Sequence, residues 1–290
     1  MNGTNFEKLM TIISAPMKLG QKLLGVELTP NLMHKAGLVK MLQSYGWTPS
    51  ISLIESCDDM FYKKLGDEAE AAARRGEFVM TIGGDHSIST GSISGMLRAR
   101  PELGVIWVDA HADLHTPTTS ETGNLHGMPV GLLMADDSTR TQLPEFTWMK
   151  NGPRLTADRL VYIGVRDMDK AEIAKIHNEH ILFFTMSDVT QLGIHEVMVR
   201  TLKYLFNLPL HLSFDIDAID PQIAPHTGTP VPGGLTFSES VEIVKTIAQT
   251  NNLCSMDLVE INPTLGQTQD ENNETLKIGM LLLESLFHLE

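Results

Sequence analysis

The sequence predicts an α/β fold, a three-layer α/β/α sandwich with a mostly parallel central sheet. Strand-like apolar runs alternate with helix-like stretches along the whole chain, and this alternation is typical of a parallel sheet covered by helices. Runs such as 78–82 are almost continuously apolar, which suits strands that are buried on both faces. Because no repeat, low-complexity tract or Pro/Gly/Ser-rich linker divides the chain, we expect one domain over residues 1–290.

The expected strands and helices follow one another in order. Strands are expected at the apolar runs 10–14, 50–54, 77–82, 104–109, 160–165, 181–185, 209–215 and 256–260. Helices are expected near 31–45, 58–75, 88–99, 169–178, 192–206, 237–250 and 274–288. The first apolar run is too short, and its flank too weakly basic, for a signal peptide, so we expect a strand there. The last, apolar helix is expected to pack in the core.

Composition narrows the classes of protein. A chain of 290 residues with 42% hydrophobic residues can bury a large core. The net charge of −14 argues against nucleic acid or an anionic membrane as a partner, and it suits a small cationic substrate or a metal ion. No apolar run approaches the ~18 residues of a membrane span. Two cysteines, Cys57 and Cys254, are too few for a disulfide framework, and free thiols fit a cytoplasmic protein.

The most informative segment follows the strand-like run 104–108 and reads Asp-Ala-His-Ala-Asp. Alternate side chains of an extended backbone point the same way. We therefore expect Asp109, His111 and Asp113 to face one spot. His115 is expected to continue the row.

Two other strand ends carry comparable residues. Asp215 and Asp217 come at the end of one predicted strand, and His86 lies in a Gly-Gly-Asp-His-Ser segment after another. A lone Asp-x-Asp is more often a turn or a helix cap, and a lone histidine is more often a hydrogen-bonded loop residue. All three segments, however, follow strands of a sheet whose carboxyl edge is where ligands bind. Together they predict a metal site.

Two histidines and four aspartates are enough for two metal ions that share bridging carboxylates. Oxygen ligands with some imidazole and no thiolate favour Mn²⁺, with Fe²⁺, Co²⁺ or Zn²⁺ as alternatives. Two ions ~3.5–4 Å apart can hold a bridging hydroxide at neutral pH, because metal binding lowers the pKa of water from ~15.7 towards ~7. The chemistry therefore predicts metal-assisted hydrolysis.

The same three segments resemble the signatures of the ureohydrolase (arginase/agmatinase) family: GGDHS at 83–87, DAHAD at 109–113 and SFDIDAIDP at 213–221. Shorter segments resemble arginases in particular, at 25–27, 123–127, 164–169, 228–230 and 260–263. The resemblance covers essentially the whole chain, in order. It implies an arginase-like fold, two Mn²⁺ ions per subunit, and a bridging hydroxide that attacks the guanidinium carbon of L-arginine, giving L-ornithine and urea.

The resemblance also implies which residues hold the ions. Asp109 and Asp215 would bridge the two ions. His86 and Asp113 would complete the ligands of one ion, and His111 and Asp217 those of the other.

Three side chains are predicted to serve the reaction itself. Glu260 can pair with the guanidinium group through charge-assisted hydrogen bonds. Asp113 can relay a proton to the leaving amine. His126 is a candidate proton shuttle on the loop above, because an unperturbed histidine titrates near ~6.5. The simpler alternatives are a surface glutamate at a strand end and a histidine that caps the next helix.

The amino-acid end of the substrate needs contacts of its own. Thr122 and Asn124 offer neutral donors for an α-carboxylate, and the resemblance adds Thr229. Asp169, with Glu172 through water, can accept from the α-ammonium group. Helix capping by Asp169 is the alternative.

His115 departs from the family. Arginases usually have asparagine at this position, where it contacts the substrate α-carboxylate, whereas a neutral imidazole has one donor and an imidazolium two. We expect His115 either to bind the carboxylate with a pH-dependent KM or to mark altered specificity. Two long segments without periodicity, 116–128 and 222–236, begin after the metal motifs and are expected to be lids or substrate-binding loops.

Other functions stay open at this point. The nearest is a sister ureohydrolase that acts on agmatine or a guanidino acid, although the loop 122–126 suits an α-amino acid. A non-catalytic family member would usually lack metal ligands, and these are all present. A zinc deacetylase on the same fold would not explain the paired metal motifs and Glu260. The resemblance implies a homo-oligomer, a trimer or hexamer.

Overall fold

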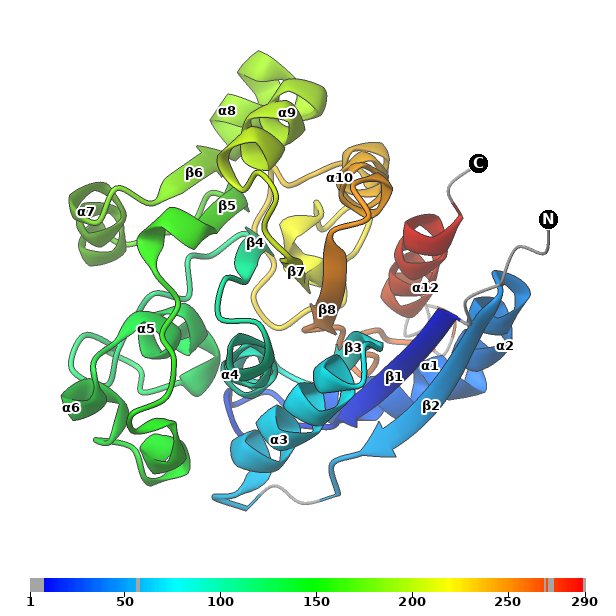
Figure 1. Cartoon of the computed structure of the whole chain (residues 1–290). Helices are drawn as coiled ribbons and strands as arrows, with labels where there is room; N and C mark the ends of the chain where they lie inside the picture. Colours follow the sequence, from blue (N-terminus) through cyan, green and yellow to red (C-terminus); the bar gives the residue numbers. More distant parts are fainter. Residues whose placement is uncertain (1–7, 56–57, 269, 271–273, 289–290) are drawn as a thin grey trace.

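One sheet of eight parallel strands forms the centre of the molecule (Figure 1). The computed structural model describes residues 8–55, 58–268, 270 and 274–288, so Cys57 lies outside the described residues. The strands stand in the order β2-β1-β3-β8-β7-β4-β5-β6. Their bounds are β1 Lys8–Ala15, β2 Trp47–Leu53, β3 Phe78–Gly83, β4 Gly104–Val108, β5 Leu160–Val165, β6 Leu182–Thr185, β7 Leu210–Asp215 and β8 Leu253–Val259. Each predicted strand is present, and the three-layer prediction is confirmed.

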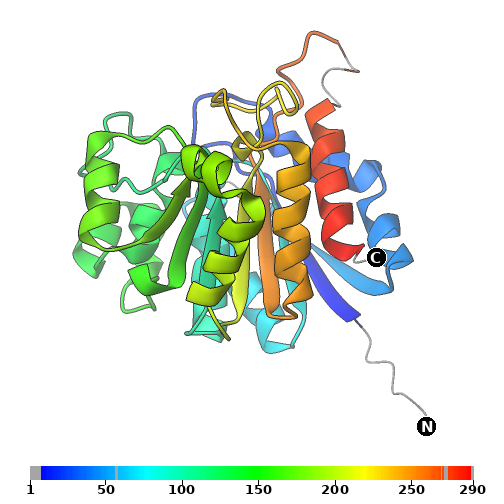
Figure 2. The ribbon, with the colours of Figure 1, turned by 90° about the horizontal axis from the view of Figure 1, so that it is seen from above.

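Helices cover both faces of the sheet (Figures 1 and 2). One face is covered by α1 Thr29–Lys35, α2 Leu38–Ser44, α8 Met186–Leu192, α9 Ile194–Tyr204, α10 Phe237–Gln249 and α12 Glu274–Phe287. The other is covered by α3 Phe61–Arg74, α4 Ser89–Ala99, α5 Pro129–Met134 with the adjoining α6 Asp137–Arg140, and α7 Lys170–Asn178. None of the helices within the described ranges is long and apolar enough to cross a membrane.

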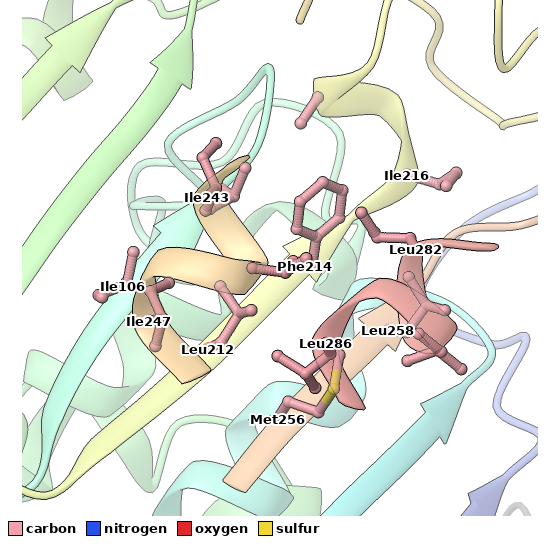
Figure 3. Close-up of a cluster of buried hydrophobic side chains, with 14 of the residues drawn as sticks. Ile106, Leu212, Phe214, Ile216, Ile243, Ile247, Met256, Leu258, Leu282 and Leu286 are labelled. Carbon is pink, nitrogen blue, oxygen red and sulfur yellow. The ribbon is translucent and has the colours of Figure 1, made fainter. Parts of the chain in front are cut away.

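Alternation along the central strands divides the core into two layers. In β4, Ile106 and Val108 join the cluster under α10 and α12, whereas Val105 and Trp107 join the cluster under α3 and α4. The first cluster is wholly apolar around the central strands (Figure 3). Each fully buried Leu or Ile there contributes roughly 1.5–3 kcal/mol through the hydrophobic effect. The last helix packs in this core as expected, because its apolar stripe, including Leu282 and Leu286, is buried.

One helix prediction was wrong at a break. The expected helix 31–45 is two helices, α1 and α2, separated at Gly37, whose φ of 98° lies in the left-handed region. The helix expected near 192–206 is confirmed as α9, and α8, which was not predicted, precedes it across Gly193, with φ 77°. The short helices α5 and α6 were not predicted, because six and four residues give too few turns for a helical period to appear.

Candidate metal centre

The predicted site residues meet at the carboxyl edge of the sheet, where β3, β8, β7, β4 and β5 are consecutive neighbours. His86 follows β3, Asp215 ends β7, and Asp109 follows β4. A pocket of about 240 Å³ opens at this edge. Its lining consists of His86, His111, Asp113, His115, His126, Gly127, Asp167, Asp169, Glu172, Asp215, Asp217 and Thr229.

Tight turns, and not extended backbone, bring the metal motifs together. β4 ends at Val108, and the Asp109 carboxylate accepts the backbone N–H of His111 at 2.7 Å. Asp215 accepts the N–H of Asp217 at 2.8 Å in the same way, and begins a short 3₁₀ helix. The expected row of alternating side chains was therefore wrong in its geometry. The aspartates cap turns, as the simpler interpretation held, and they also face a common centre.

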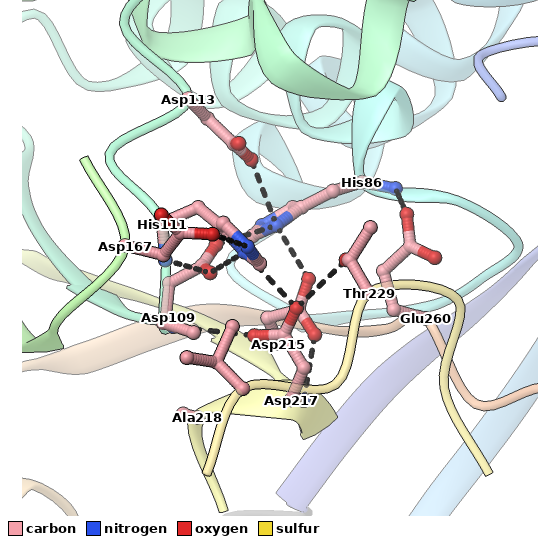
Figure 4. A network of polar contacts seen from close by, with 12 residues as sticks. His86, Asp109, His111, Asp113, Asp167, Asp215, Asp217, Ala218, Thr229 and Glu260 are labelled. Atoms are coloured by element: carbon pink, nitrogen blue, oxygen red, sulfur yellow. Dashed lines mark hydrogen bonds and ion pairs between the residues drawn. The ribbon is translucent and has the colours of Figure 1, made fainter. Parts of the chain in front are cut away.

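The first cluster surrounds His86, whose ring lies between Asp113 and Asp215 in Figure 4. Its Nδ1 is 3.0 Å from Asp109 Oδ2, 3.2 Å from Asp113 Oδ2 and 3.0 Å from Asp215 Oδ2. The ring is buried and stacks on Trp107, with centroids 4.1 Å apart and planes 7° apart. Three carboxylate oxygens around one imidazole nitrogen form the donor arrangement of a cation site.

His111 forms the second cluster on the other side of Asp109. Its Nδ1 is 3.3 Å from Asp109 Oδ1 and 3.1 Å from Asp217 Oδ2. Asp217 is itself fixed, because it accepts hydrogen bonds from the backbone N–H of Ala110 at 3.2 Å and from Thr229 Oγ1 at 3.2 Å. The two oxygens of Asp109 thus face different histidines, so that one carboxylate joins both clusters.

The electrostatics of the clusters fit a pair of cations. Burial, and then the charges of Asp217 and Asp109, raise the pKa of Asp215 well above its usual value. Burial and the charge of Asp109 raise the pKa of Asp113 to about 7. Burial acts to lower the pKa of His111, but the carboxylates of Asp217 and Asp109 raise it to about 12. Buried carboxylates that repel one another need positive charge, and the oxygen and imidazole donors suit divalent ions.

Glu260 lies next to the clusters but is already engaged by protein groups. Its Oε1 accepts the backbone N–H of His86 at 2.8 Å and lies 3.2 Å from His126 Nδ1, while its Oε2 accepts Gln21 Nε2 at 2.5 Å. Burial acts to lower the pKa of His126, but the Glu260 carboxylate raises it to about 9. Glu260 is 1% exposed and has a left-handed φ of 65°. It is not among the residues that line the pocket, whereas His126 is.

The predicted contacts for the amino-acid end of a substrate divide into two groups. Asp169 and Glu172 line the pocket, where they also form a capping box at the start of α7. The two residues therefore cap the helix, as the alternative held, and also line the pocket. Thr122 and Asn124 lie outside the lining, on the loop 116–128, where Thr122 Oγ1 accepts the Asn124 N–H at 3.1 Å. The structure does not bring these two side chains to the pocket wall.

Several supporting residues were missed in the sequence. Trp107 donates its Nε1–H to Asp109 Oδ2 at 2.9 Å, and Ser213 Oγ is 2.9 Å from His86 Nε2. Trp107 and Ser213 each lie two residues before a predicted ligand, Asp109 or Asp215. This spacing could have indicated both, because alternate residues of a strand share a face. Gln21 gave no such signal, since it contacts a residue 239 positions away.

The fold and this site define an α/β protein with a candidate centre for two metal ions. The family model described as the arginase family matches residues 8–288, so the chain belongs to the arginase family. It is 40% identical over 300 residues to the mitochondrial arginase-2 of Bos taurus, covering 96% of this chain and 84% of that protein.

Solved arginases share the architecture. The crystal structure of arginase from Bacillus subtilis aligns with a TM-score of 0.89 at 32% identity, over 98% of this chain and 99% of that chain. Arginase of Entamoeba histolytica in complex with L-ornithine aligns with a TM-score of 0.88 at 31% identity, over 97% and 98% of the two chains. The expectation of an arginase-like fold is confirmed.

Proposed function

We propose that the protein is an arginase, a hydrolase that converts L-arginine and water to L-ornithine and urea. The observation that carries this proposal is the Asp109 carboxylate, which faces His86 with one oxygen and His111 with the other in a pocket at the carboxyl edge of the sheet. Relatives across the whole chain are arginases, and one of them was solved with L-ornithine.

We further propose two Mn²⁺ ions per chain, with Fe²⁺, Co²⁺ or Zn²⁺ as alternatives. His86 and Asp113 would hold one ion and His111 and Asp217 the other, with Asp109 and Asp215 shared. A pair of bound divalent ions supplies a strong nucleophile at neutral pH, because it lowers the pKa of water towards ~7. Asp109 and His86 are buried, so their attraction for the ions would be stronger than in bulk water.

The other side chains would bind and orient the substrate or move protons. Glu260 fixes His126 through Nδ1, which leaves Nε2 of the imidazole as the atom that exchanges a proton with solvent. Glu260 has three protein partners, and its two oxygens offer about four acceptor sites, so the guanidinium group can bind at the remaining site on Oε2. Asp113 is the proposed proton relay to the leaving amine.

The amino-acid end would be held at the pocket mouth. Asp169 would accept from the α-ammonium group, with Glu172 acting through water. Thr229 donates a hydrogen bond to Asp217 and lines the pocket, where a substrate can contact it. His115, Thr122 and Asn124 are the proposed contacts of the α-carboxylate, and for the last two the loop 116–128 must close over the pocket when substrate binds.

The test is urea release from L-arginine and from agmatine by the Mn²⁺-loaded protein, with a chelated sample as control. We expect fast, metal-dependent release from arginine and little from agmatine, because agmatine lacks the α-carboxylate. An Asn124→Ala variant should reduce this preference by weakening arginine turnover selectively. Preference of the wild type for agmatine, the main alternative substrate, would contradict the proposal, as would the absence of urea from both.

We also propose that residues 1–290 act as one catalytic domain in a cytoplasmic homo-oligomer, a trimer or hexamer. The low cysteine content suits a reducing compartment, and the oligomer follows from the resemblance to the family. Light scattering on the eluting protein would measure the mass, and a monomer of 32.0 kDa would contradict the assembly.

A further inference from the structure

A third group of imidazole and carboxylates stands at the mouth of the same pocket, apart from the two buried clusters. It consists of His115, Asp169 and Glu172, and their ligand-type atoms lie within 4.8 Å of one another. His115 Nε2 is 3.5 Å from Asp169 Oδ2 and 3.8 Å from Glu172 Oε1.

The three side chains are held in place by contacts that leave these atoms facing one another. Asp169 Oδ1 accepts the Glu172 N–H at 2.8 Å, and Glu172 Oε2 accepts the Asp169 N–H at 3.1 Å, as the capping box of α7. Glu172 Oε1 also accepts the Leu114 N–H at 3.2 Å. On the imidazole, Nδ1 lies 3.4 Å from Thr119 Oγ1, so that Nε2 is the nitrogen directed at both carboxylates.

We propose that this mouth cluster binds a third divalent cation, of the Zn²⁺ type. Imidazole nitrogen and carboxylate oxygen both bind Zn²⁺, and a zinc site with three protein ligands leaves a further position open to solvent. Little reorganisation is needed, because the capping box already fixes both carboxylates. An ion can reach the cluster from solvent, because the Asp169 side chain is 51% exposed. The Glu172 side chain, which is 8% exposed, would lie on the buried side of the ion.

The ion would compete with the amino-acid end of the substrate, a consequence that rests on the proposed function. The cation would take the carboxylate oxygens of Asp169 and Glu172 that the α-ammonium group contacts directly and through water. An asparagine at position 115 would remove the imidazole ligand and with it most of the cation affinity. The histidine therefore gives this chain a cation-sensitive substrate mouth that an asparagine at the same position would not provide.

The experiment counts zinc. Metal-free wild type, His115→Asn and His195→Asn are each equilibrated with excess Zn²⁺, and bound zinc per folded chain is measured by atomic emission after dialysis. His195 is the matched control, because it is an imidazole beside a carboxylate, Glu242, on the far helices α9 and α10, with 83% of its side chain exposed. We expect the wild type and His195→Asn to bind one ion more than His115→Asn. Saturating L-ornithine should remove that same ion from the wild type.

Equal zinc counts in wild type and His115→Asn overturn the third site. A shared count of two leaves the proposed function standing, whereas a shared count below two contradicts both proposals. A third ion that persists under saturating L-ornithine overturns the competition. Thermal unfolding of each variant shows whether the chain is folded, and Asp169→Asn offers a second route to the same loss of one ion if His115→Asn is unstable.

Discussion

The deep centre, His86 and His111 with their aspartates, and the mouth cluster use the same chemistry in different surroundings. The carboxylates of the deep centre are at most 10% exposed, whereas that of Asp169 at the mouth is 51% exposed. The imidazoles of His111 and His115 are alike, at 23% and 21%. An uncompensated charge raises the free energy of the folded state strongly when it is buried and only slightly when it is solvated. The deep centre therefore requires cations to be stable as an array of carboxylates, whereas the mouth cluster tolerates either an ion or a substrate ammonium group.

The two groups also differ in what holds them. The deep ligands end or follow β3, β7 and β4, which are rigid central strands, and they are backed by Trp107 and Ser213. The mouth cluster joins a loop residue to the first turn of α7. Loss of a deep contact should accordingly affect metal binding and catalysis together, while loss of a mouth contact should affect substrate binding.

The largest effect is expected from Asp109→Asn, which breaks the carboxylate that joins the two deep clusters. We expect kcat for arginine to fall by about 10³-fold, at the upper end of what one preorganised polar group contributes. The count of bound Mn²⁺ should also fall. Asp167→Asn is the control, because this exposed residue lines the same pocket 3.8 Å from His111 Nε2. Activity of Asp109→Asn within tenfold of wild type would contradict the assignment.

Ser213→Ala should weaken metal binding without removing a ligand. The serine lies 2.9 Å from His86 Nε2 and orients the imidazole, and loss of such a supporting contact typically costs ~10–100-fold in metal affinity. Titration of the metal-free protein with Mn²⁺ measures the change. Ser240→Ala provides the control, since this buried serine bonds only within α10 and its cap. Unchanged affinity in Ser213→Ala would show that Trp107 and the aspartates orient the ring alone.

His115→Asn is expected to keep arginine hydrolysis within about tenfold, because one hydrogen bond contributes only ~0.5–1.5 kcal/mol net. KM should rise, while kcat should stay close to that of the wild type. The reason is that the mouth cluster is separate from the deep centre. Steady-state kinetics on both proteins decide this. A loss of arginine hydrolysis well beyond tenfold, or a loss confined to kcat, would contradict the assignment of His115 to substrate binding alone.

The smallest effect concerns Asp257, which lies beneath the deep centre on the same face of the sheet. It accepts Ser92 Oγ at 2.6 Å and lies 3.2 Å from His211 Nε2. Burial acts to raise the pKa of Asp257, but His211 and the serines lower it overall. In the unfolded chain an aspartate titrates near ~3.9. Its stabilisation is therefore complete above about pH 4 and is lost as pH falls through the lower pKa of the folded state.

Urea unfolding of the metal-free wild type and Asp257→Asn between pH 7 and pH 3 tests this. The wild type should have the higher free energy of unfolding at pH 7, and its advantage should shrink below pH 4. A difference that stays constant with pH would mean that the carboxylate charge contributes nothing beyond the hydrogen bonds that asparagine can also accept.

The sequence alone predicted the parallel sheet, because apolar runs and turn residues are local patterns. It also predicted that Asp109, His111, Asp215 and Asp217, the proposed metal ligands, lie close together, since they stand next to the ends of strands, and such ends share one edge of a parallel sheet. It was wrong where a single backbone angle decides, as at Gly37, which divides one expected helix into two. The expected extended row at 109–113 was wrong for a different reason, because the Asp109 side chain accepts the His111 N–H and so forms a turn.

Only the tertiary structure decided which distant groups touch. The insertion of β8 and β7 between β3 and β4 places Glu260 beside His86, and packing brings Gln21 to the same carboxylate. The position of His115 Nε2 next to Asp169, the cap of α7, likewise depends on how a loop and a helix from separate segments pack. Such contacts are set by strand order and side-chain packing over the whole chain, whereas local patterns in the sequence specify only the elements and their ends.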